Sequence, residues 1–287
     1  MQHDCLSVNQ KVSVKHTLTH RLKRKKYLGF KELLCLTLFP IYIYIAECRL
    51  INRLSPAFNS ADRIVILSQR FLSYGSKIIG KKNLHKVRAI ANFLTLPEES
   101  SISLEIERKS KEVLIISRLC EERKRISIAL RIWYLMEKKA ETSDWKLVIV
   151  GGGDDADFYK ALARKLDLKR VVFEGRCDNI VPYYQTASIF MMTSDMEGWG
   201  LTLTESLQMG VVPFAFDSFE SLHDIIVDNV NGCIVTNNDI NEYSMRLLDL
   251  MCNSEKRRTM AMTGIKSAQR FTVDKIMSEW KSLIEEN

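Results

Sequence analysis

From residue 113 to residue 215, short runs of apolar residues alternate with longer stretches of helical character. The apolar runs occupy residues 113–117, 145–150, 171–173, 189–192 and 211–215. Short runs rich in valine and isoleucine are typical of strands that are buried on both faces. Strands that alternate with helices form a parallel sheet covered on both sides, so the sequence predicts an α/β fold with a doubly wound sheet in this region.

The residues before this region repeat the pattern less completely. Apolar, β-branched runs at residues 63–67 and 87–91 predict two strands, and residues 71–80 between them predict a short helix. A doubly wound domain needs more than two strands. The N-terminal part of the chain therefore predicts an incomplete domain of the same class.

Positive charge is concentrated near the N-terminus. The chain has 287 residues and a net charge of +7, and residues 21–26 form a basic block without any acid. Such a block favours contact with nucleic acid or an anionic membrane surface, or it is a solvated face. Residues 33–46 form an apolar run of 14 residues, whereas a spanning helix needs about 20, so we expect a buried or interfacial helix broken near Pro40.

The cysteines and histidines predict neither a disulfide framework nor a metal site. The seven cysteines are odd in number and contain no Cys-x-x-Cys pair, and the five histidines lack metal-ligand spacing. Free cysteines are typical of a reducing compartment. We expect a cytoplasmic protein with peripheral contact at the inner face of the cell membrane, and no nucleic-acid partner.

Two cations follow the first predicted strand of the C-terminal region. Arg118 comes directly after residues 113–117, and Lys124 comes six residues later. Ligands bind beyond the carboxyl ends of the strands in an open parallel sheet, where two cations suit a diphosphate. Taken alone, the pair is explained better as ordinary surface charge, but the acidic loop described next reverses that interpretation.

Residues 195–210, DMEGWGLTLTESLQMG, follow the predicted strand 189–192. Glu197 and Glu205 stand eight positions apart, with Gly198 and Gly200 between them. Glycines let backbone N–H groups approach a ligand, and the start of the following helix suits a phosphate. The glutamates can accept hydrogen bonds from sugar hydroxyls, so this segment predicts a site for a nucleotide-linked sugar; the alternative is a loop with a helix cap.

Three further candidates remain open. Gly152 and Gly153 belong to the triple glycine after strand 145–150, and they approach a phosphate or a base, or form a tight turn. His16 ends a short predicted strand and is either a donor to a sugar hydroxyl or a structural residue. Asp217 and Ser218 follow strand 211–215 and are expected to approach the same pocket.

Residues 112–287 resemble the C-terminal half of GT-B glycosyltransferases of family 4, the glycosyl transferases group 1. The resemblance rests on the segments EVLIISRL, WKLVIVGGG, VVFEG, EGWGLTLTE, GVVPFAFDS and NGCIV. Residues 62–92 resemble the end of this family's first domain. The resemblance implies two Rossmann-like domains, a partial acceptor-side domain over residues 1–106 and a donor-binding domain over residues 107–287.

The resemblance also implies an activity and site roles. The reaction would be retaining transfer of a hexose from a UDP- or GDP-sugar to a hydroxyl of a glycan or lipid-linked acceptor, with no metal or other cofactor. Glu197 would contact the donor sugar and Glu205 the ribose, while Arg118 and Lys124 would hold the diphosphate. Backbone amides would assist at Gly200, Leu201 and Thr202.

The sequence departs from the family pattern in places. Ser117 stands where most relatives have glycine, and Arg125 stands where a glycine often follows the lysine. His16 falls near the place of a family histidine that lies close to the sugar. The opening strands of the first domain are missing, which predicts N-terminal truncation. The alternatives are an inactive nucleotide-sugar-binding remnant or partner subunit, another GT-B activity such as a sugar-nucleotide epimerase, and a membrane-anchored scaffold.

Overall fold

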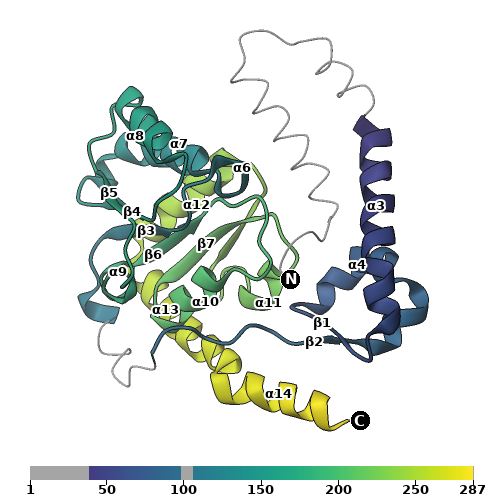
Figure 1. Ribbon diagram of the computed structural model, residues 1–287. Helices are drawn as coiled ribbons and strands as arrows, with labels where there is room; N and C mark the ends of the chain where they lie inside the picture. Colours follow the sequence, from purple (N-terminus) through teal and green to yellow (C-terminus); the bar gives the residue numbers. More distant parts are fainter. Residues whose placement is uncertain (1–38, 98–105, 287) are drawn as a thin grey trace. The chain divides into compact units, whose positions relative to one another are not determined.

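The computed structural model describes residues 39–97 and 106–286. The chain divides into two compact units between Ala91 and Asn92 (Figure 1). His16, the basic block at residues 21–26 and the first part of the apolar run lie outside the described residues. Within the described part, no helix is both long enough and apolar enough to cross a membrane.

The first unit contains a pair of parallel strands and a long helix. Strand β1 (Ile64–Ile66) pairs with β2 (Val87–Ala89), which confirms both predicted strands. Between them lie η1 (Gln69–Phe71), α4 (Leu72–Ile79) and η2 (Lys81–Lys86). Helix α3 (Phe39–Ser60) packs against α4, and Leu50 and Ile78 are buried together.

Helix α3 extends further than the sequence predicts. Pro40 occupies its first turn, where proline is tolerated because the missing N–H would have no helical partner there. The helix continues beyond the predicted apolar run, which ends at residue 46, to Ser60, with Pro56 inside it.

The second unit is built on a six-stranded parallel sheet. The strands are β3 (Glu112–Ile116), β4 (Lys146–Val150), β5 (Val171–Gly175), β6 (Ile189–Met192), β7 (Val212–Asp217) and β8 (Cys233–Thr236). Their spatial order is β5-β4-β3-β6-β7-β8, and every pair is parallel. This is the doubly wound order, which confirms the predicted fold class and places the topological switch point between β3 and β6.

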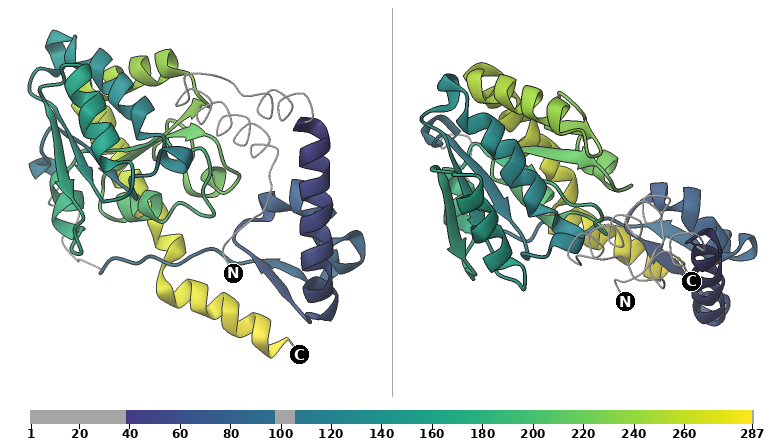
Figure 2. Two further views of the ribbon diagram at one scale, coloured as in Figure 1. Left: turned by 45° about the horizontal axis from the view of Figure 1, so that its top comes forward. Right: turned by 90° about the horizontal axis from the view of Figure 1, so that it is seen from above.

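Helices cover both faces of this sheet (Figure 2). One face carries helices that pack on one another, α7 (Ile126–Glu137), α8 (Ala156–Lys165) and α12 (Ile240–Cys252). The other face carries α9 (Val181–Thr186), α10 (Leu201–Gln208) and α13 (Ser254–Ala268). The remaining elements are η3 (Ile106–Arg108), α6 (Glu121–Lys124), η4 (Ala140–Thr142), α11 (Leu222–Ile225), η5 (Gln269–Phe271) and α14 (Val273–Glu285).

The core of this unit is formed by strand residues and the helices above them. Ile149 and Phe214 are fully buried, as are Trp133 of α7 and Tyr243 of α12. Complete burial of one such side chain contributes about 1.5–3 kcal/mol. A well-packed core of this kind holds the ends of the strands in place.

The segment after Ala91 belongs to the second unit. The Leu94 N–H donates to the Phe271 carbonyl at 2.8 Å, and Gln208 Nε2 donates to the Leu96 carbonyl at 2.9 Å. The family resemblance implies a domain boundary after residue 106. The structure divides the chain earlier, because Leu94 and Leu96 are hydrogen-bonded to η5 and α10.

Candidate functional site

A narrow crevice lies at the topological switch point of the second unit. Its polar lining is Ser117 after β3, Lys124 at the end of α6, and Thr193 and Ser194 after β6, and the rest of the lining is apolar, from β3, β6 and Ile126. We call the crevice beside these four residues the switch crevice. The carboxyl ends of diverging strands leave a gap at this position in open α/β sheets, and ligands commonly occupy it.

Lys124 and Glu197 form an ion pair at the crevice. Lys124 Nζ lies 2.5 Å from Glu197 Oε1. The side chains keep 23% and 15% of their exposure, so both charged groups remain accessible to a ligand. The structure thus brings together two of the predicted site residues that lie 73 positions apart in the chain.

The loop that carries Glu197 leads directly into the start of α10. Gly200 adopts a left-handed conformation with φ +95°, and the helix begins at the next residue. Within the described part of the chain, the backbone N–H groups of Gly200, Leu201 and Thr202 make no hydrogen bond. Unpaired N–H groups at a helix start, with no acid in the first turn, favour an anion.

The rest of this loop is anchored by contacts with Phe271 and Ser221. Trp199 is 3% exposed and its ring meets Phe271 edge-on at 5.4 Å between centroids. Ser221 Oγ donates to the carbonyls of Gly198 and Trp199 at 3.2 and 3.1 Å. Gly198 itself is exposed. These contacts anchor the loop while leaving Glu197 at the surface.

Glu205 occupies a different environment from Glu197. It is 7% exposed, and its two oxygens accept from Thr95 Oγ1 at 2.6 Å and from Tyr184 OH at 2.8 Å. Burial and the nearby Glu205 charge raise the pKa of Tyr184, so the phenol stays protonated and donates. A carboxylate has acceptor capacity for further bonds, and contact of Glu205 with a ribose remains a prediction.

Arg118 lies on the loop after β3 and is exposed. Its side chain makes no hydrogen bond or ion pair with any other described residue, so it is available to a ligand. Its backbone carbonyl accepts from the Cys120 N–H at 3.0 Å and from Ser117 Oγ at 3.2 Å. The predicted contact of Arg118 with a diphosphate is compatible with this placement.

The triple glycine after β4 packs against the loop that carries Arg118. A Cβ on Gly151 would lie 1.8 Å from the Ser117 carbonyl oxygen, and one on Gly153 would lie 2.4 Å from that of Leu119. The Leu119 N–H donates to the Gly152 carbonyl at 3.0 Å. This close approach explains Gly151 and Gly153 as a turn; the predicted ligand contacts of Gly152 and Gly153 remain predictions.

The sequence marked Arg125 only as a departure from the family pattern and did not predict its burial next to the site. Arg125 directly follows Lys124 and is fully buried, and its Nη1 lies 2.9 Å from Asp195 Oδ1. The available signal was a cation at a position where glycine is common in relatives.

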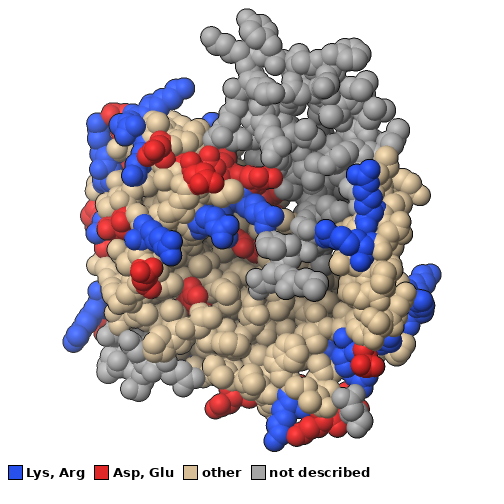
Figure 3. All heavy atoms as spheres, viewed as in Figure 1, with Lys and Arg blue, Asp and Glu red and all other residues tan. Residues whose placement is uncertain are grey.

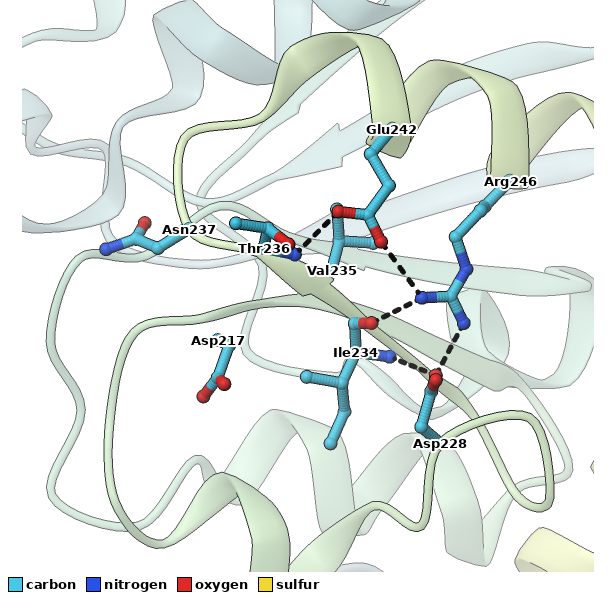
Figure 4. Close-up of a pocket in the computed structure, with 8 residues that line it drawn as sticks. All are labelled: Asp217, Asp228, Ile234, Val235, Thr236, Asn237, Glu242 and Arg246. Atoms are coloured by element: carbon cyan, nitrogen blue, oxygen red, sulfur yellow. Dashed lines mark hydrogen bonds and ion pairs between the residues drawn. The ribbon is translucent and has the colours of Figure 1, made fainter.

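A larger hollow of about 470 Å³ lies at the β7–β8 end of the sheet (Figure 4). Arg246 donates there to the Ile234 carbonyl at 2.5 Å and pairs with Asp228 at 2.5 Å. The Ile234 N–H donates to Asp228 Oδ1 at 2.8 Å, and the Thr236 N–H donates to Glu242 Oε2 at 3.0 Å. These side chains satisfy the outer backbone groups of β8, which is an edge strand.

Asp217 lines this hollow rather than the switch crevice. Its Oδ1 lies 2.9 Å from His223 Nε2. The expectation that Asp217 and Ser218 approach the same pocket as Lys124 is therefore wrong for Asp217. Ser218 Oγ, in contrast, donates to the carbonyl of Ser194, a residue of the crevice, at 2.7 Å.

Charges of both signs are mixed on the face of the molecule drawn in Figure 3. Blue and red side chains lie side by side over the described residues there. Among residues 39–97 and 106–286, no group of three or more His, Cys, Asp or Glu side chains is assembled as a metal site.

The family model for glycosyl transferases group 1 matches residues 97–267. That segment includes Lys124, Glu197, the start of α10 and all six strands of the sheet. The chain belongs to this family. The family resemblance read from the sequence motifs is thereby confirmed.

Relatives in the glycosyl transferases group 1 family cover most of this chain. An uncharacterized glycosyltransferase of Haemophilus influenzae is 28% identical over 229 residues, which are 79% of this chain and 62% of that protein. The amylovoran biosynthesis glycosyltransferase AmsD of Erwinia amylovora is 24% identical over 96% of this chain and 75% of its own length. The chain thus spans less than two thirds of the Haemophilus relative.

Solved structures share the fold of this group 1 chain. HepE of Anabaena, in complex with UDP and glucose, matches with a TM-score of 0.68 at 20% identity, over 84% of this chain and 67% of that one. Similarity at this level of identity shows the fold alone. The second unit has the parallel-sheet architecture of a GT-B glycosyltransferase domain, as the sequence motifs predicted.

Proposed function

We propose that this chain binds a nucleoside-diphosphate hexose at the switch crevice and transfers the hexose to a hydroxyl of a glycan or lipid-linked acceptor. The observation that carries the proposal is the accessible Lys124–Glu197 ion pair beside the unpaired N–H groups of α10. Family membership and the UDP and glucose complex of HepE support it.

The proposed binding chemistry uses the donors that surround the crevice. The Lys124 ammonium has three N–H donors, and its bond to Glu197 leaves two for phosphate oxygens. The amides of Gly200, Leu201 and Thr202 and the exposed Arg118 add further donors. A charge-assisted hydrogen bond contributes roughly 1.5–3 kcal/mol, so a few such bonds are enough to hold a diphosphate.

The same groups would promote transfer. When the bond between the sugar and the β-phosphate breaks, negative charge grows on the leaving diphosphate. Lys124, Arg118 and the α10 amides would stabilise that charge, which is the electrostatic contribution that usually dominates such catalysis. The acceptor hydroxyl would attack on the face that the phosphate leaves, its proton passing to the leaving phosphate, and Glu197 would hold the sugar hydroxyls.

Calorimetry with UDP and GDP tests this proposal directly. We expect one nucleotide to bind, and we expect Lys124→Ala to weaken binding at least about tenfold. Lys256→Ala is the matched control, since Lys256 Nζ also pairs with an acid, Asp249, at 2.7 Å but away from the crevice. Equal behaviour of the two variants, or no binding of either nucleotide, would contradict the proposal.

Turnover is measured separately with nucleotide sugars and an acceptor. Hexose transfer, or slow donor hydrolysis that Lys124→Ala lowers at least about tenfold, supports the transferase. Nucleotide binding without any turnover would instead identify a binding protein, the remnant or partner-subunit alternative. Isomerised nucleotide sugar formed without acceptor would identify an epimerase.

A further inference from the structure

Arg125 connects three loops at the carboxyl edge of the sheet. It joins α6 to α7, and its backbone is left-handed, with φ +48° and ψ +42°. A non-glycine residue pays a conformational cost of roughly 1–2 kcal/mol in this region. The side chain is 0% exposed, so its charge is removed from water as well.

All five N–H donors of this guanidinium are used. Nε donates to the Thr193 carbonyl and Nη2 to the Ser194 carbonyl, each at 2.8 Å. Nη2 also donates to Asn237 Oδ1 at 3.1 Å, and Nη1 donates to Asn238 Oδ1 at 2.8 Å and to Asp195 at 2.9 Å. The partners lie on the segment after β6 and on the turn between β8 and α12.

Other hydrogen bonds also hold the segment after β6, among them one of 2.7 Å from Ser218 Oγ to the Ser194 carbonyl. Thr193 Oγ1 donates to the Lys124 carbonyl at 2.9 Å, and the Asp195 N–H donates to the Arg123 carbonyl at 2.8 Å. The latter two bonds and the Arg125 clamp attach residues 193–195 to the end of α6. Glu197 follows two residues later, opposite Lys124.

The left-handed backbone and the buried charge of Arg125 both cost free energy, so these costs must be offset by favourable interactions. Burial lowers the pKa of the guanidinium, and the charges of Asp195 and Glu121 oppose that shift. Replacing a buried pair with apolar residues is often neutral or stabilising, so such a pair is weak evidence for stability alone. Its attachment to the carbonyls next to the Glu197 loop indicates a role in geometry.

We propose that Arg125 is a positioning residue that holds residues 193–197 so that Glu197 meets Lys124 and the donor sugar. This inference rests on the proposed function. Arg125 touches neither nucleotide nor sugar in this role. It acts on the transfer step through the placement of Glu197.

Hydrogen exchange and nucleotide titration of Arg125→Lys test the inference. Lysine keeps the charge but cannot bridge five acceptors. We expect amides of residues 194–199 to exchange at least about tenfold faster, while the dissociation constant for UDP changes less than about threefold. A panel of UDP-sugars first identifies the one that binds the unaltered chain. We expect Arg125→Lys to lose the additional affinity that this sugar contributes over UDP alone, and turnover to fall at least about tenfold.

Arg246→Lys is the matched control, because Arg246 also bridges a carbonyl and two acids but lies at β8. If Arg125→Lys changes exchange at residues 194–199 no more than Arg246→Lys does, or lowers UDP and UDP-sugar affinity equally, the inference is wrong. Should the lysine variant fail to fold, Asp195→Asn replaces it, with an expected local exchange increase of about threefold and an unchanged segment as the contrary result. Absence of nucleotide binding by the unaltered chain would reject the proposed function, and the exchange measurement would still decide whether Arg125 holds the segment.

Discussion

The two hollows at the carboxyl edge of the sheet differ in size and in how their charges are used. The hollow at β7–β8 is the larger, at about 470 Å³, yet Asp228, Glu242 and Arg246 there are hydrogen-bonded to the backbone of the edge strand (Figure 4). The switch crevice is narrow, and its Lys124–Glu197 pair leaves donors unused. The larger hollow therefore lies where side chains stabilise the edge strand. The candidate site is instead the narrower crevice, where hydrogen-bond donors remain unpaired.

The largest expected effect concerns the frame of the switch crevice. Gly151→Ala would drive its Cβ into the Ser117 carbonyl at a φ of +140°, so we expect a loss of at least about 3 kcal/mol in the free energy of unfolding. Gly175→Ala is the control, because φ is +80° there but nothing lies within 4 Å. We expect a loss of only about 1 kcal/mol for it in denaturant titrations; equal losses would show that the close approach is unimportant.

A reciprocal pair of variants tests the comparison itself. Arg246→Met removes the donor to the Ile234 carbonyl and the partner of Asp228, so we expect the free energy of unfolding to fall by about 1 kcal/mol with UDP affinity unchanged. Lys124→Met should do the reverse, weakening UDP binding at least about tenfold with a smaller change in stability. Thermal unfolding and calorimetry on both variants measure this, and a nucleotide effect from Arg246→Met would erase the distinction.

A variant at Tyr184 tests whether Glu205 belongs to the site or to the core. Tyr184→Phe removes the hydroxyl group that donates to Glu205 Oε2. Because this leaves a buried acceptor without its partner, we expect the free energy of unfolding to fall by about 1–2 kcal/mol. We expect UDP affinity to change less than about threefold. A loss of tenfold or more would show that the orientation of Glu205 controls nucleotide binding.

The sequence predicted most of the sheet because its strands are short, apolar and regularly spaced. Strand β8 was not predicted, since CIVT is brief and flanked by turn residues and its pairing with β7 is a long-range interaction. The contact of Asp155 was not predicted either. Asp155 stands directly before α8 without capping it, and its Oδ2 accepts from the Glu121 N–H at 2.8 Å.

The candidate site was predicted in parts. Lys124 and Glu197 follow neighbouring strands of a parallel sheet, so their proximity follows from topology. The partners of Glu205 could not be predicted, because Thr95 and Tyr184 reach it from distant segments.

The saturated guanidinium of Arg125 constrains how this chain can change over generations. A glycine at position 125 would remove the conformational cost of the left-handed backbone. It would also leave the Asp195 carboxylate, which is 2% exposed, without its cationic partner. A neutral residue at position 195 would leave the arginine charge equally isolated. Positions 125 and 195 are therefore expected to covary among homologues. A homologue without the arginine should also lack the aspartate.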